Sequence, residues 1–187
     1  MAVRIYGNRA IKTLPGETTR PTSSRVREAL FNIWHGRVLG ARWLDLCAGS
    51  GAMGAEALCR GATEAFGIEK SGAACRVVQE NWQKVANLDQ TFTVVRGDVV
   101  RQLAQLAAQV QSGARPPFDL AYFDPPYAGS LYEPVLKRVS GCLSDRAEIA
   151  VEYNEALWQP QVPPDLEIVK EKRYGSTQLL FLRPLDS

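Results

Sequence analysis

The chain of 187 residues has only one histidine, four cysteines and no hydrophobic run long enough to cross a bilayer. The cysteines are Cys47, Cys59, Cys75 and Cys142. None of them forms a C-x-x-C pair and His35 has no spaced partner, so the sequence indicates reduced thiols and no metal. It also lacks a charged and then apolar leader with a cleavage site, which predicts a cytoplasmic protein with no membrane partner.

Charge is distributed unevenly along the chain. The net charge is only +2, but residues 1–42 hold eight Arg or Lys side chains against Glu17 and Glu28, a balance of +6. Residues 43–187 have a balance of −4. A basic front on a mildly acidic body favours docking of a polyanion at one place, and a solvated basic tail is the alternative. The basic residues expected to contact such a partner are Arg4, Arg9, Lys12, Arg20, Arg25 and Arg27.

The basic front has its own secondary-structure pattern. β-Prone runs at 3–6 and 9–14 flank Gly7-Asn8, a dipeptide typical of a two-residue hairpin turn. Apolar residues at helical spacing then predict a helix over 22–34, which begins at a Thr-Ser cap and ends before a glycine. We therefore expect a hairpin followed by a helix with one core-facing side.

Strand and helix patterns alternate from residue 43 onward. The expected strands are 43–47, 65–69, 91–95, 118–123, 148–153, 166–173 and 177–182, and the expected helices are 52–60, 72–85, 99–110 and 131–143. This alternation predicts a parallel sheet with helices on both faces. Only Tyr174-Gly175-Ser176 separates the last two strands, so the last strand should run antiparallel. The expected units are an extension, 1–42, and a catalytic domain, 43–187.

A glycine-rich loop follows the first of these strands. Gly49, Gly51 and Gly54 match the G-x-G-x-x-G pattern of dinucleotide-binding folds, and Glu69 ends the next strand, where an acid binds ribose hydroxyls. An NAD-dependent enzyme is therefore one interpretation. Against it, Asp45 places a carboxylate in a strand end that such folds keep apolar. That carboxylate suits a cationic ligand better than a pyrophosphate.

Two further acids follow later strands of the expected sheet. Asp98 follows a strand and is placed to accept a hydrogen bond from an adenine amino group, and Asp124 follows the next strand. The carboxyl ends of parallel strands meet at one edge of a sheet. Together with Asp45 and Glu69, these acids predict a pocket for an adenosine derivative that carries positive charge.

The tetrapeptide Asp124-Pro125-Pro126-Tyr127 follows the apolar strand at 118–123. Strand packing does not require a carboxylate and two residues without amide donors. An exocyclic amine of a nucleobase does need fixed acceptors for its hydrogens, and Asp124 and the Pro125 carbonyl supply them while Tyr127 stacks on the ring. A proline-rich turn that ends a core strand is the alternative interpretation.

These residues resemble the successive motifs of the class I S-adenosylmethionine-dependent methyltransferases. More narrowly, three stretches resemble the bacterial RsmD family of 16S rRNA guanine-N2 methyltransferases. They are Arg20-Pro-Thr-Ser-Ser-Arg-Val-Arg-Glu-Ala-Leu-Phe-Asn, Ala48-Gly-Ser-Gly and Asp124-Pro-Pro-Tyr. The similarity extends over nearly the whole chain, including Val151-Glu-Tyr and the final Tyr174-Gly-Ser-Thr turn.

The resemblance implies a fold, a cofactor and a partner. The fold is α/β, a class I methyltransferase Rossmann-like seven-stranded, mostly parallel sheet with an antiparallel last strand, plus an N-terminal β-hairpin and helix. S-adenosylmethionine is the expected cofactor, small-subunit rRNA or a ribosomal assembly particle the expected partner, and a monomer the expected state. The implied cofactor contacts are Asp45, Ala48, Gly49, Ser50, Gly51, Glu69, Lys70, Asp98, Val99 and Asp124.

The resemblance also assigns catalytic roles. The target guanine must leave its stack to reach the methyl group. Asp124 and the Pro125 carbonyl would then orient N2, with Pro126 keeping the turn rigid and Tyr127 against the ring. Arg20 and Arg27 have two open roles, contact with RNA or ordering of the loop over the cofactor.

Two other functions are compatible with the motifs. Some DNA N6-adenine methyltransferases also use Asp in this tetrapeptide, but a large target-recognition insert is expected for them and none is present. A catalytically silent RNA-binding assembly protein would not need the intact glycine loop and acids. We interpret His35 as a surface residue, Trp82 as packing and Glu152 as a structural acid.

Overall fold

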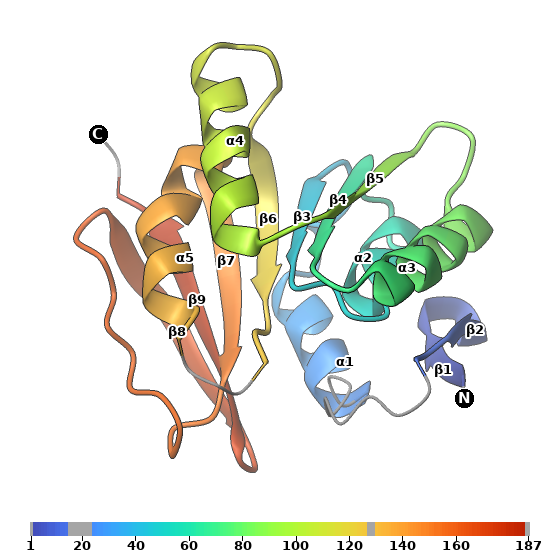
Figure 1. Cartoon of the computed structure of the whole chain (residues 1–187). Coiled ribbons are helices and arrows are strands. Elements are labelled where there is room, and N and C mark those ends of the chain that lie inside the picture. The colour runs from blue at the N-terminus through green and yellow to red at the C-terminus, as the bar shows by residue number, and fades with distance from the viewer. Residues whose placement is uncertain (1, 15–23, 127–129, 186–187) are drawn as a thin grey trace.

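The alternating strands assemble into one seven-stranded sheet in the order β5-β4-β3-β6-β7-β9-β8 (Figure 1). The computed structural model describes residues 2–14, 24–126 and 130–185. The strands are β3 (Arg42–Leu46), β4 (Glu64–Glu69), β5 (Thr91–Arg96), β6 (Phe118–Phe123), β7 (Leu143–Tyr153), β8 (Leu166–Tyr174) and β9 (Thr177–Pro184). Strands β3 to β7 run parallel and β9 runs antiparallel to both of its neighbours, which confirms the predicted sheet.

Helices cover both faces of the sheet. The helices are α1 (Ser24–Ile33), α2 (Ala52–Cys59), α3 (Gly72–Val85), α4 (Val99–Gln111) and α5 (Tyr132–Val139). Buried residues of α4 and α5 pack on one face, and those of α1, α2 and α3 on the other. Because both faces are covered, the central strands β3 and β6 are almost wholly buried.

One boundary differs from its expectation. Helix α5 ends at Val139 and the short 3-10 helix η2 (Ser140–Cys142) follows, so that β7 begins at Leu143 rather than near residue 148. Leu143 pairs with Phe118 at the start of β6. Backbone pairing with β6 therefore extends β7 toward its amino end, which the polar pattern of these residues does not reveal.

The N-terminal hairpin consists of β1 (Ala2–Ile5) and β2 (Arg9–Lys12), joined by the 3-10 segment η1 (Tyr6–Asn8). The connection has three residues rather than the expected two, since Ile5 pairs with Arg9. Gly7 and Asn8 both have positive φ, and the Tyr6 amide donates to Glu56 Oε2 at 3.2 Å instead of joining the ladder. The hydrogen bond to Glu56 of α2 thus determines the length of the turn.

The hairpin is attached to α2 and α3. Ile5 and Ile11 are buried in a core cluster with Leu58 of α2 and Val78 and Trp82 of α3. The hairpin of the predicted extension therefore packs against α2 and α3, the helices that follow β3 and β4.

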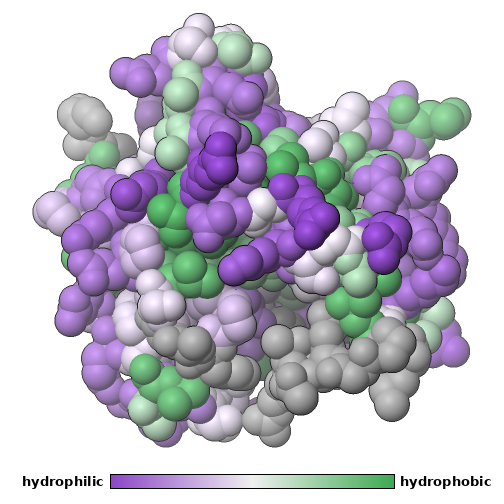
Figure 2. Space-filling view, viewed as in Figure 1, coloured by the Kyte–Doolittle hydropathy of each residue, from purple (hydrophilic) through white to green (hydrophobic). Residues whose placement is uncertain are grey.

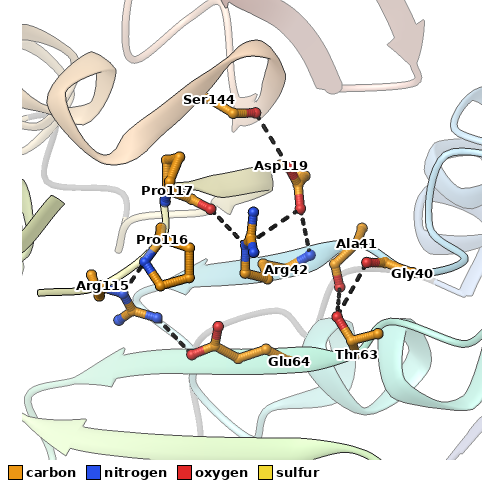
Figure 3. Close-up of polar contacts among 10 residues, drawn as sticks. All are labelled: Gly40, Ala41, Arg42, Thr63, Glu64, Arg115, Pro116, Pro117, Asp119 and Ser144. Atoms are coloured by element: carbon orange, nitrogen blue, oxygen red, sulfur yellow. Dashed lines mark hydrogen bonds and ion pairs between the residues drawn. The ribbon is translucent and has the colours of Figure 1, made fainter. Parts of the chain in front are cut away.

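A polar network links the strands at their amino ends, opposite the site described below (Figure 3). Asp119 Oδ2 of β6 accepts from the Arg42 amide of β3 at 2.8 Å, and Arg42 Nε donates to the Pro117 carbonyl at 2.8 Å. Arg115 donates to Glu64 Oε1 of β4 at 2.6 Å and also lies over two phenylalanine rings. Strands β3, β4 and β6 are therefore cross-linked at this end.

Hydrophilic residues cover most of the face seen in Figure 2, and hydrophobic residues form separate patches on it. Within the described residues, no helix has both the length and the apolar character needed to cross a membrane.

Candidate functional site

A cavity of about 320 Å³ lies at the carboxyl ends of β3, β4, β5 and β6, where the strand order changes direction. Its wall includes eleven of the residues predicted for cofactor binding or catalysis. They are Asp45, Ala48, Gly49, Ser50, Glu69, Lys70, Asp98, Val99, Asp124, Pro125 and Pro126. The cavity therefore brings together the predicted cofactor residues and the described part of the catalytic tetrapeptide.

The loop after β3 forms one wall of the cavity. Cys47 has a φ of 63°, which is unusual for a residue with a side chain, and Gly49 has a φ of 56°. Asn81 of α3 donates to the Ser50 carbonyl at 2.9 Å, and it exchanges hydrogen bonds with both the amide and the carbonyl of Lys12 in the hairpin. One buried side chain therefore fixes the loop and the hairpin together.

Gly51 is not among the residues that line the cavity, and its predicted close approach to the ligand stays a prediction. Its φ is 74°, and a Cβ there would lie 2.8 Å from Trp82 Nε1 and 2.8 Å from Val78 Cγ1. The Trp82 indole donates to the Gly51 carbonyl at 2.8 Å. Gly51 is therefore needed for the turn and for the space that the buried indole fills.

Glu69 at the end of β4 accepts two backbone hydrogen bonds. Its Oε2 accepts from the Gly49 amide at 2.9 Å and its Oε1 from the Ser71 amide at 2.8 Å. The carboxylate is thereby fixed between the loops that follow β3 and β4, at the edge of the cavity.

Asp45 lies in β3 and is 2% exposed. Its Oδ2 accepts from the Gly54 amide of α2 at 3.0 Å. Burial raises the pKa of Asp45 to about 7; the Gly54 hydrogen bond opposes this rise and the charge of Glu69 adds to it. Ionising a carboxyl group that is buried without a cation costs free energy. A cationic ligand in the cavity would therefore stabilise the ionised form of Asp45.

Asp98 precedes α4 and caps it. Its Oδ1 accepts from the Arg101 amide at 3.0 Å, while the following residue, Val99, is buried at the cavity wall. This hydrogen bond fixes the orientation of the Asp98 carboxylate, which the sequence predicts to accept from an adenine amino group.

The four acids of the cavity all affect the pKa of one thiol, that of Cys47. Burial raises the pKa of the Cys47 thiol to about 12, and the charges of Glu69, Asp124, Asp45 and Asp98 add to this rise in that order. Carboxylates from four strand ends therefore lie near one half-buried thiol. The cavity lining holds these four acids against Arg27 and Lys70, and this excess of acidic side chains favours a cationic ligand over a pyrophosphate.

The tip of β6 closes another side of the cavity. Asp124 is half-buried, Pro125 is buried and Pro126 is exposed, and all three line the cavity. Neither proline has an N–H, so this turn contributes acceptors to the site. Tyr127 lies outside the described residues.

The predicted RNA-binding residues separate into two groups. Arg4, Arg9, Lys12 and Arg25 are exposed. Arg27 is 3% exposed, donates from Nε to Glu56 Oε2 at 3.0 Å and from a terminal nitrogen to the Arg4 carbonyl at 2.6 Å, and lines the cavity.

Burial thus removes Arg27 from the surface set and corrects the expectation that it contacts RNA phosphates. The alternative role given to it above, ordering of the loop over the cofactor, stays a prediction. Arg20 lies outside the described residues.

Several residues near the cavity received no functional role from the sequence. Met53, Tyr122 and Leu131 line it, and Asn81 and Trp82 hold its glycine loop. Their apolar or helical spacing indicated only packing, so no sequence signal distinguished them. Over the described ranges, no cluster of three metal-ligating side chains is found, and His35 is exposed, as expected, and is not among the residues that line the cavity.

Comparisons with known proteins agree with this geometry. The family model described as Conserved hypothetical protein 95 matches residues 3–183. The ribosomal RNA small subunit methyltransferase D of Escherichia coli strain K12 is 35% identical over 159 residues, which cover 83% of this chain and 75% of that protein.

Two solved structures show the shared fold. The Escherichia coli protein yhhF superposes with a TM-score of 0.81 at 30% identity and covers 98% of both chains. SMU.776, a structure described as complexed with SAH, has a TM-score of 0.65 at 13% identity and covers 85% of this chain and 48% of that one, a likeness of fold alone. The chain therefore belongs to the Conserved hypothetical protein 95 family, the RsmD family that its motifs resemble.

Proposed function

We propose that this protein transfers a methyl group from S-adenosylmethionine to the exocyclic N2 of a guanine in small-subunit rRNA. The observation that carries the proposal is the convergence of Asp45, Glu69, Asp98 and Asp124 on one cavity at the strand ends. The kinship with methyltransferase D supports rRNA as the substrate, and the resemblance to the RsmD family supports guanine N2.

The residues present fit S-adenosylmethionine. When bound, this cofactor supplies an electrophilic methyl group on a positively charged sulfur, which leaves as a neutral thioether. The negative cavity suits that charge, and Glu69 and Asp98 provide acceptors for ribose hydroxyls and the adenine amine. The SAH bound to SMU.776, which has the same fold, agrees with this choice.

The acceptor side of the cavity is assigned to the tip of β6. Asp124 and the Pro125 carbonyl hold the two hydrogens of the guanine amine, so that the nitrogen lone pair points at the methyl carbon. As the N–C bond forms, the nitrogen becomes cationic and its proton passes to Asp124 or to water. Asp124 need not be a strong base, since positioning supplies most of the acceleration.

Substrate docking is assigned to the extension, residues 1–42. Its exposed basic residues Arg4, Arg9, Lys12 and Arg25 would contact rRNA phosphates, with a strength that falls as salt rises. A substrate in the small subunit or its precursor places the protein in the cytoplasm.

The proposal predicts both a ligand and a product. Calorimetry should detect binding of S-adenosylmethionine and no binding of NAD at the same concentrations, because the cavity is negative. Small-subunit particles from cells that lack the gene should gain one N2-methylguanine when incubated with the protein and cofactor, as read by nuclease digestion and mass spectrometry. Methylated adenine, or cofactor binding without any methylated product, would contradict the proposal.

Cofactor binding should depend on the protonation of Asp45. The carboxyl is neutral below its raised pKa of about 7 and charged above it, so the attraction for a cationic ligand is lost as the pH falls. We expect the affinity for S-adenosylmethionine to fall by about tenfold between pH 8 and pH 6. Calorimetry on Asp45→Asn should show weaker binding with little pH dependence, and a wild-type profile in that variant would exclude this role for Asp45.

A further inference from the structure

Tyr122 of β6 is the one strand-interior aromatic side chain in the described wall of the cavity. It is 2% exposed and packs in the core cluster that contains the buried residues of α1. Its hydroxyl donates to Glu152 Oε2 of β7. A buried tyrosine at the cavity wall is thus held by a carboxyl group that does not itself line the cavity.

Glu152 is 5% exposed. Its backbone carbonyl accepts from the Tyr132 hydroxyl at 3.1 Å. The Tyr132 ring in turn stacks on Trp158, with ring centroids 4.1 Å apart. A buried carboxylate costs free energy unless donors satisfy it, so the position of Glu152 calls for a reason beyond packing.

The strand register gives that reason. Asp45 of β3 is the register partner of Tyr122, and the last parallel pair between β6 and β7 immediately precedes Asp124 and Glu152. Neighbouring strands are about 4.8 Å apart, so these positions are adjacent across the sheet. Tyr122 therefore lies beside Asp45, the acid assigned to the cofactor, and two residues before Asp124, the acid assigned to the acceptor.

We propose that Tyr122 forms the wall at which methyl donor and acceptor meet, and that Glu152 is a positioning residue that acts through the Tyr122 hydroxyl. The inference rests on the proposed function and extends it to the spacing of the two substrates. With the hydrogen bond in place, the ring keeps one orientation and excludes water beside Asp124. Without it, the ring rotates and the reacting atoms lose their alignment.

Three variants test the pair. Tyr122→Phe keeps the ring and removes the hydroxyl, Glu152→Ala removes the acceptor, and Glu152→Gln keeps an acceptor oxygen for the tyrosine. We expect Tyr122→Phe and Glu152→Ala each to lower kcat by about 10- to 100-fold, with the KM for small-subunit particles and the Kd for S-adenosylmethionine within about threefold of wild type. The double variant should be no slower than the worse single variant, and Glu152→Gln should retain most of the activity.

A second readout follows the hydrogen bond itself. The Tyr122 hydroxyl proton, assigned by its loss in Tyr122→Phe, should exchange slowly in NMR spectra of the wild type and of Glu152→Gln, and should vanish in Glu152→Ala. A kcat within about twofold of wild type in Tyr122→Phe, or a loss of cofactor affinity equal to the loss of kcat, would overturn the proposal. If the wild type itself methylates no particle, the proposed function fails, and an unprotected hydroxyl proton would separately overturn the pair.

Discussion

Asp124→Ala should lower the single-turnover rate of methyl transfer by about 10³-fold while the Kd for S-adenosylmethionine changes by less than about threefold. Asp124 lines the cavity and is half-buried, and under the proposed function its removal deletes an acceptor for the amine hydrogens. Three acids of the other strands remain in place for the cofactor. Rapid-quench measurement of methyl transfer to small-subunit particles and calorimetry with the cofactor separate the two effects.

Asp98→Ala is the matched control for this result. It removes an acid from the same cavity, but from the end of β5, where an adenine amine would bind. We expect it to weaken cofactor binding and to leave the rate at saturating cofactor within about tenfold of wild type. If Asp124→Ala transfers the methyl group at the wild-type rate, Asp124 is not catalytic.

Trp82→Ala should lower the free energy of unfolding by about 3–5 kcal/mol. Trp82 is fully buried, and its indole donates to the Gly51 carbonyl at 2.8 Å. Truncation would leave a cavity beside the glycine loop and an unsatisfied carbonyl. Urea denaturation followed by circular dichroism measures the change, and a loss below about 1 kcal/mol would show that the surrounding glycines relax into the space.

The glycines around Trp82 give a sharper form of this experiment. A Cβ at Gly54 would lie 2.3 Å from Trp82 Cζ2, and one at Gly67 would lie 2.7 Å from Trp82 Cη2. Gly54→Ala should therefore destabilise the wild type by about 1–3 kcal/mol, yet should be neutral or stabilising in Trp82→Ala, where a helical alanine is favoured.

Gly72→Ala is the control for Gly54→Ala, since its Cβ would meet only the mobile end of Arg96 at 3.3 Å. It should change the free energy of unfolding by less than about 0.5 kcal/mol. Equal effects of Gly54→Ala in the presence and absence of Trp82 would exclude the steric coupling.

Much of the fold and of the site could be predicted from the sequence because acidic residues occur at the ends of the strands. Asp45, Glu69, Asp98 and Asp124 each lie at or beside the carboxyl end of a strand, and parallel strands bring such ends to one edge. The short Tyr174–Thr177 connection likewise required an antiparallel last strand. Local spacing was sufficient in both cases.

Contacts between distant segments could not be predicted in this way. Gly51 has the spacing of a ligand-binding glycine, but the sequence does not reveal that an indole 31 residues later packs on it and binds its carbonyl. Arg27 has the composition of a surface basic residue, yet Glu56 pairs with it in the interior. The three-residue turn before Arg9 also depends on Glu56, which accepts from the Tyr6 amide. Each outcome depends on which helix covers which part of the sheet.

The hydrogen bonds of Asn81 join the hairpin to the loop that lines the cofactor cavity. Thermodynamic linkage between two such sites is reciprocal. If a polyanion that docks on the hairpin changes the affinity for the methyl donor, the donor must change the affinity for the polyanion by the same factor. Asn81 is the side chain through which the structure connects the two sites.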